Sequence, residues 1–188
     1  MNATAMNQIV ELCLRLDNHA SRLYQSLARN AETQDLKGFW QDIAAKNEQH
    51  QLYWDRLLNW ADEGMLNNLF DDTGKILDEL TGLDDKVCDL ADSCKQVRRK
   101  KKAFTMAFKL EFYLLHPVFE TLSQYVATFN GDVGSEFSYE RFVNRLFDAL
   151  QQNELGTLEL ELVGEVIHRL WKENRRMAFL SNYDELTG

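Results

Sequence analysis

Apolar residues recur every three to four positions through most of the chain, which is the periodicity of α-helices with one buried face. The first such stretch covers residues 4–30 and begins at a cap formed by Asn2 or Thr4. The second covers residues 35–64, with Asp35 as its cap and Gly64 near its end. Only a short connection separates these stretches, so they are predicted to be antiparallel neighbours.

The remaining chain predicts a second pair of helices after a long connection. Residues 65–95 are rich in Asp and Gly between short apolar patches, which indicates a crossover with one or two short helices. A helix over residues 96–129 is expected to be kinked or split by Pro117. A short helix over 139–151 and a long one over 155–180 follow. The prediction is one all-α domain, residues 1–188, made of a helix pair (4–64), a crossover (65–95) and a second helix pair (96–181).

Charge and composition exclude several classes of function. A net charge of −9 and a pI near 4.9 disfavour a general nucleic-acid binder, and the basic run at residues 98–102 fits a solvated helix face. Three cysteines without a Cys-x-x-Cys pair indicate neither a disulfide framework nor a zinc knuckle. The most apolar stretch, residues 103–119, is interrupted by Lys109, Glu111 and Pro117, so no membrane span is expected. We therefore expect a cytoplasmic protein.

Polar residues interrupt the inner face of each long helix. These residues are Asp17 in the first helix, Asn47 and His50 in the second, Glu111 in the third, and Glu165 with His168 in the last. A buried carboxylate costs several kcal/mol unless it is paired or coordinated. A shared di-metal carboxylate site would explain all of them, since the spacing Glu-x-x-His directs both side chains to one cation. Oxygen and imidazole donors suit iron or manganese.

Two parts of the chain resemble a rubrerythrin-type ferritin-like domain. Residues 17–28 (DNHASRLYQSLA), Phe39-Trp40 and residues 47–50 (NEQH) are similar to its first half, which reads Glu-x-x-Ala-x-x-x-Tyr-x-x-Leu-Ala and then Glu-x-x-His. Glu111 and residues 165–168 (EVIH) are similar to its second half. The resemblance covers most of residues 5–60 and, more loosely, 100–175. It implies a ferritin-like four-helix bundle with a di-iron centre, in which Asp17, His50, Glu111, Glu165 and His168 hold the metals and Tyr24 lies beside them.

The chain also departs from that family pattern. Asp17 and Asn47 stand where the family has glutamate, and Val118 stands where the second half would carry the counterpart of Tyr24. No rubredoxin-like cysteine module is present in the sequence. Glu48 and Glu161 are left open as extra ligands.

Three functions remain in competition at this stage. The first is a di-iron protein that reacts with peroxide or dioxygen, receives electrons from a separate donor protein and forms a homodimer. The second is a metal-free bundle that binds a protein partner through its acidic surface and residues 65–95. The third is iron binding or storage without turnover.

Overall fold

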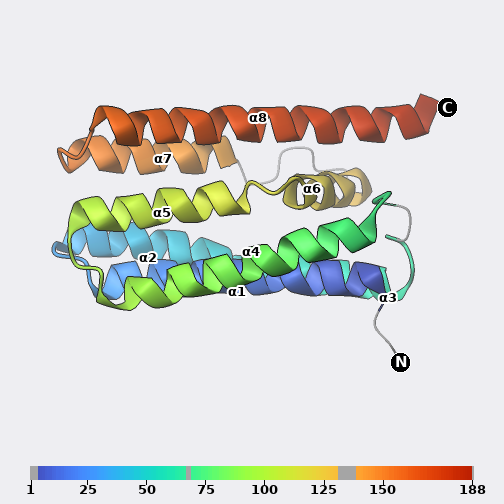
Figure 1. Cartoon of the computed structure of the whole chain (residues 1–188), viewed down its shortest axis with the longest axis horizontal. Coiled ribbons are helices and arrows are strands. Elements are labelled where there is room, and N and C mark those ends of the chain that lie inside the picture. Colours follow the sequence, from blue (N-terminus) through green and yellow to red (C-terminus); the bar gives the residue numbers. More distant parts are fainter. Residues whose placement is uncertain (1–3, 67–68, 131–138, 188) are drawn as a thin grey trace. The chain divides into compact units, whose positions relative to one another are not determined.

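The described residues are entirely helical, as the sequence predicts. The computed structural model describes residues 4–66, 69–130 and 139–187, and these ranges contain eight α-helices and no strand (Figure 1). Within them, no helix combines the length and the hydropathy that crossing a membrane requires. The chain divides into two compact units, Met1–Met106 and Ala107–Gly188.

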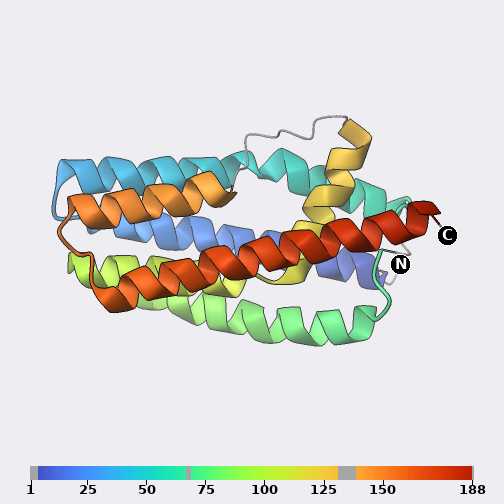
Figure 2. The same cartoon turned by 90° about the horizontal axis from the view of Figure 1, so that it is seen from above.

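The first unit is built around α1 (Ala5–Arg29), which Thr4 caps through its side chain. The helices α2 (Gln34–Gln49) and α3 (Gln51–Asp62) pack along α1, and so does α4 (Thr73–Ser93) (Figures 1 and 2). The expectation of one or two short helices in the crossover is wrong, since α4 is a single helix of 21 residues. Asp72 caps α4 by accepting a hydrogen bond from the backbone N–H of Lys75.

The second predicted helix differs from expectation at both its start and its middle. Thr33, and not Asp35, caps α2, because the Thr33 hydroxyl accepts a hydrogen bond from the Leu36 N–H at 3.3 Å. The helix is also interrupted at His50, which separates α2 from α3 while keeping right-handed helical dihedral angles. The two pieces therefore remain close to one continuous helix.

An aromatic cluster forms the core of the first unit between α1, α2 and the start of α5 (Lys100–Leu114). Trp40 is 1% exposed and stacks on Tyr24 with ring centroids 5.9 Å apart. Phe39 and Phe104 complete the cluster, with their ring centroids 4.7 Å and 5.0 Å from that of Trp40. Such contacts add to the free energy gained from apolar burial alone.

The second unit contains the last part of α5 together with α6 (Pro117–Asn130), α7 (Tyr139–Gln152) and α8 (Leu158–Thr187). Pro117 splits the predicted third helix into α5 and α6, and the Nδ1 atom of His116 accepts a hydrogen bond from the Val118 N–H. The helix α8 runs alongside α7 and is crossed by α6, which packs against it (Figure 2). Gly164 makes the contact with α7 close, because a Cβ atom there would lie 1.8 Å from the Phe147 ring.

The packed face of α8 is not the predicted one. The sequence pattern predicts that Leu158, Leu162 and Trp171 share one inner stripe. In the structure, however, Leu158 is 81% exposed and Leu162 is 57% exposed. The buried apolar residues of α8 are Leu160, Ile167, Trp171 and Ala178. This buried face lies more than 90° around the helix from Leu162. The polar residues of α8 therefore face other directions than the sequence pattern predicts.

Glu154 ends α7 in a backbone conformation that normally belongs to glycine. Its φ is 55°, and the N–H groups of Glu154 and Leu155 bond back to the carbonyls of Gln151 and Leu150. The same arrangement ends α3 around Gly64, where φ is 76°. We expect Glu154→Gly to raise the free energy of unfolding by about 0.5–1 kcal/mol, because it removes the steric cost of a left-handed residue. Urea denaturation measures this, and Gly64→Ala should lower stability by a similar amount.

Candidate functional site

The candidate site in the first unit consists of three side chains, one from α1, one from the junction between α2 and α3, and one from α3. Asp17 projects from α1 toward this junction, where the Nδ1 atom of His50 lies 3.2 Å from each of its carboxylate oxygens. The indole Nε1–H of Trp54 donates a hydrogen bond of 3.0 Å to Oδ2 of Asp17. Asp17 and His50 are 13% and 17% exposed. The structure thus brings together two of the predicted site residues and adds Trp54.

The proton positions in this network follow from its chemistry. A carboxylate only accepts hydrogen bonds, so the His50 nitrogen that faces Asp17 must carry a proton. Asp17 then accepts from two N–H donors, the imidazole and the indole. The second imidazole nitrogen, Nε2, takes no part in this contact with Asp17. Asp17 and Nδ1 of His50 cannot ligate one cation while this N–H lies between them.

The residues one turn before and after Asp17 on α1 are both buried. Cys13, one turn earlier, is fully buried, and burial together with the nearby Asp17 charge raises the pKa of its thiol. Ser21, one turn later, is also buried. The side chains of Asn47 and Glu48, which we expect near the site, lie outside the described part of the structure.

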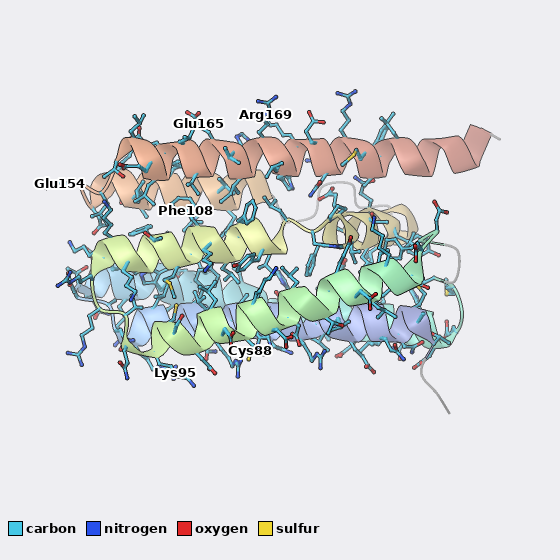
Figure 3. The ribbon with its side chains drawn as sticks, in the orientation of Figure 1. Cys88, Lys95, Phe108, Glu154, Glu165 and Arg169 are labelled. Carbon is cyan, nitrogen blue, oxygen red and sulfur yellow. The ribbon has the colours of Figure 1, made fainter. Side chains whose placement is uncertain are left out.

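The predicted site residues of the second unit differ in exposure. Glu111 is 4% exposed, as expected for an inner position. Glu165 is exposed and extends from the side of α8 that faces away from α7 (Figure 3), so the expectation that it lies on an inner face is wrong. His168 is half-buried and stacks on Trp171 with ring centroids 6.2 Å apart, while Glu161 is half-buried.

Tyr24 is a core residue of the first unit. It is 1% exposed and stacks on Trp40, and it lies seven residues beyond Asp17 on α1. Its role as a residue beside a metal centre stays a prediction. The packing contact alone accounts for its burial.

The di-iron centre stays a prediction, and two side-chain positions bear on it. The N–H of His50 lies between its ring and Asp17, and Glu165 points away from the packed face of its helix. Across the described residues, no group of three or more His, Cys, Asp or Glu side chains is placed to hold a metal ion. The arrangement in the first unit can instead hold a buried charge through hydrogen bonds, and it ties α1 to α3.

A second polar cluster, between α1 and α4, was not predicted from the sequence. Asp84 lies 3.2 Å from the guanidinium of Arg15 and 3.3 Å from Nε2 of His19. Arg22 contacts Nδ1 of His19 and the thiol of Cys88, which Figure 3 labels on α4. Since a guanidinium only donates, Nδ1 of His19 accepts and the proton of the neutral ring lies on Nε2, toward Asp84. These residues come together only because α4 packs on α1, and a pattern within one helix does not reveal such a contact.

This cluster makes a prediction about pH. Burial and the Arg22 and Arg15 charges lower the pKa of His19, against the opposing effect of Asp84. A histidine with a lower pKa in the folded than in the unfolded state contributes stability above the unfolded value of about 6.5 and loses it as the pH falls. We expect NMR titration to place His19 below about 6.5, and Arg22→Ala to raise its pKa. A His19 pKa above that value would contradict the assignment.

No protein-family model matches this chain, and no curated protein sequence matches it either. The ferritin-like resemblance therefore rests on the residues quoted for it and stays a prediction.

Proposed function

We propose that this chain is a ferritin-like helical module that works by binding a protein partner, with a metal-free polar network at the position of the family's metal centre. The observation that carries this proposal is the double occupation of the Asp17 carboxylate by the Nε1–H of Trp54 and the Nδ1–H of His50. Asp17 and the Nδ1 atom of His50 could bind one cation together only if these hydrogen bonds were lost. A satisfied network of this kind specifies how α1 packs on α3 without a cation.

The surface of α4 supports a partner of basic character. Its exposed residues from the N-terminal cap onward include six acidic side chains, Asp72, Asp78, Glu79, Asp85, Asp89 and Asp92, against two lysines, Lys75 and Lys86. The chain as a whole carries a formal net charge of −9. Complementary charge steers association and selects partners more than it adds affinity. We infer that a basic protein surface is the counterpart of α4.

The di-iron oxidoreductase is the second candidate, and one observation favours it. Asp17 and His50 come from different helices and lie together, and Glu111 is buried. In that function Asp17, His50, Glu111, Glu165 and His168 would hold iron or manganese, and the metal would supply redox chemistry toward peroxide or dioxygen. Glu165 is exposed, which disfavours this candidate, and no reaction step is derived from such a centre.

A metal count separates the two candidates. Protein purified without chelators is reconstituted with ferrous iron under argon, desalted and analysed for metals. We expect much less than one iron per chain, with the same result for His50→Ala and for Glu165→Ala. One or two irons per chain, lost in either variant, would overturn the metal-free proposal. Two irons whose visible spectrum changes with peroxide would establish the second candidate instead.

A further inference from the structure

Positive side chains gather at one end of the first unit, although the chain as a whole is acidic. The run 98–102 (RRKKK) leads into α5, and its side chains are exposed except that of Lys100, which is half-buried. Arg29 lies in the last turn of α1, and Lys37 lies near the start of α2. We call these seven residues the basic end.

Two sets of contacts bring the segments of the basic end together. The side-chain amide of Asn30, the residue after α1, donates hydrogen bonds of 3.3 and 3.0 Å to the carbonyls of Cys94 and Lys95. In the second turn of α5, the ring centroid of Phe104 lies 5.0 Å from that of Trp40 on α2. The end of α1 and the starts of α2 and α5 therefore lie side by side, at the left of Figure 1.

The fold leaves the charges of the basic end without acidic partners. In the part of the chain that the structure describes, the side chains of the run 98–102 and of Lys37 form no ion pair or hydrogen bond. Arg29 donates one hydrogen bond of 3.0 Å to the hydroxyl of Ser26, which is neutral. These charges are therefore available to a partner.

The start of α5 adds to the positive potential. Its cap position is Arg99, whose carbonyl accepts the first helical hydrogen bond, 3.0 Å long, from the Ala103 N–H. An arginine side chain only donates hydrogen bonds, so it cannot cap the free N–H groups of the first turn. That turn carries three lysines and no acid, at the positive end of the helix dipole. A bound anionic group would offset this unfavourable arrangement.

The cations of the basic end line two hollows. The first, of about 330 Å³, is lined by Gln96, Val97, Arg98, Arg99 and Lys102. The second, of about 350 Å³, lies between α1 and α2, and its polar lining is Gln25, Arg29, Lys37 and Gln41. Ligand pockets usually have volumes of about 300–1,000 Å³, so both hollows are small. They suit single acidic side chains, to which the guanidinium, ammonium and amide groups can donate hydrogen bonds.

We propose that the basic end binds an acidic peptide segment of a protein partner, whose carboxylates enter the two hollows. A nucleic acid or an anionic membrane presents negative charge over a wide area, which the exposed acids of α4 in the same unit would repel. A short acidic segment can contact the basic end alone. This inference adds a second surface to the proposed interaction function and in that sense rests on it.

Fluorescence anisotropy with a labelled oligoglutamate peptide tests the proposal in the full chain. We expect saturable binding that weakens as salt is added. Arg98→Gln with Lys102→Gln should weaken it about tenfold or more. The matched control is Lys75→Gln with Lys86→Gln, since both lysines are exposed on α4 and the net charge changes equally. This control should change the affinity less than about twofold. Absent binding, or equal losses in the two double variants, would overturn the proposal.

Further measurements locate the site and separate its possible occupants. In an NMR titration with the same peptide, amide shifts should concentrate in residues 25–41 and 96–102, and shifts concentrated elsewhere would contradict the assignment. Tighter binding of a single-stranded oligonucleotide or of phosphatidylserine vesicles would replace the acidic peptide as the partner. Self-association that Arg98→Gln with Lys102→Gln abolishes would make a second copy the occupant instead.

The metal count distinguishes a failure of this inference from a failure of the proposed function. A chain that takes up no iron and binds no oligoglutamate would overturn this inference alone. A chain that binds the peptide at the basic end and also holds two irons would overturn only the metal-free proposal.

Discussion

Trp40→Ala is expected to lower the free energy of unfolding by about 3–5 kcal/mol. The side chain is 1% exposed, and its ring contacts Tyr24, Phe39 and Phe104, whose ring centroids lie between 4.7 and 5.9 Å away. Removing the indole leaves a cavity bounded by three other rings. These rings come from three helices, so the cavity can collapse only if those helices move together.

Urea denaturation followed by far-UV circular dichroism measures this loss. Trp60→Ala is the matched control, because Trp60 lies on α3 and is only half-buried. We expect it to cost about 1–2 kcal/mol. Trp40→Phe should also cost less than the alanine variant, since it keeps an aromatic ring in the cluster. Equal losses for Trp40→Ala and Trp60→Ala would show that the aromatic cluster is not the centre of this core.

The helices whose apolar residues occupy a single face were predictable from the sequence. In α1 the predicted apolar residues, such as Ile9, Leu16 and Leu23, are buried. Of the two predicted caps, Asn2 and Thr4, it is Thr4 that caps the helix. Pro117 likewise predicts the division of α5 from α6, because its ring cannot be accommodated inside a helix. In these cases local chemistry and tertiary packing agree.

The helix α8 shows where this reasoning ends. It carries apolar residues on two faces, so periodicity predicts a helix but does not determine which face is packed. The choice depends on contacts with other helices, such as the close approach of Phe147 to Gly164. An inner stripe placed through Leu162 put Glu165 inside, whereas the packed stripe through Ile167 leaves Glu165 outside.

The candidate site was predictable in its residue pair and not in its chemistry. Asp17 and His50 each interrupt an apolar face at a similar height in neighbouring antiparallel helices, and this suffices to expect them together. The sequence does not reveal which nitrogen of His50 faces Asp17. Trp54 fits the apolar periodicity of its helix, and its indole N–H, which bonds to Asp17, gives no signal in that pattern. Metal site and hydrogen-bond network therefore look alike in the sequence.

Asp17→Ala is expected to lower the free energy of unfolding of the metal-free protein by about 2–4 kcal/mol. The carboxylate is 13% exposed and accepts from both His50 and Trp54. Its removal leaves two N–H donors in a site with little access to water, and each donor then carries its own desolvation cost. Asp17→Asn should lower the free energy of unfolding by less, because the amide oxygen can still accept a hydrogen bond from His50 or Trp54. The loss is not zero, since the amide NH₂ group would face the other N–H donor.

The measurement is made by urea denaturation in the presence of a chelator and again with ferrous iron under argon. Asp78→Ala serves as the control, because Asp78 is an exposed acid on α4, and we expect its effect to stay within about 0.5 kcal/mol. If the network is complete without metal, the loss in Asp17→Ala is the same under both conditions, since no cation contributes to the folded state. A ligand that binds only the folded state would instead stabilise the parent chain selectively. A loss in Asp17→Ala that becomes larger with iron would therefore assign Asp17 to a metal centre.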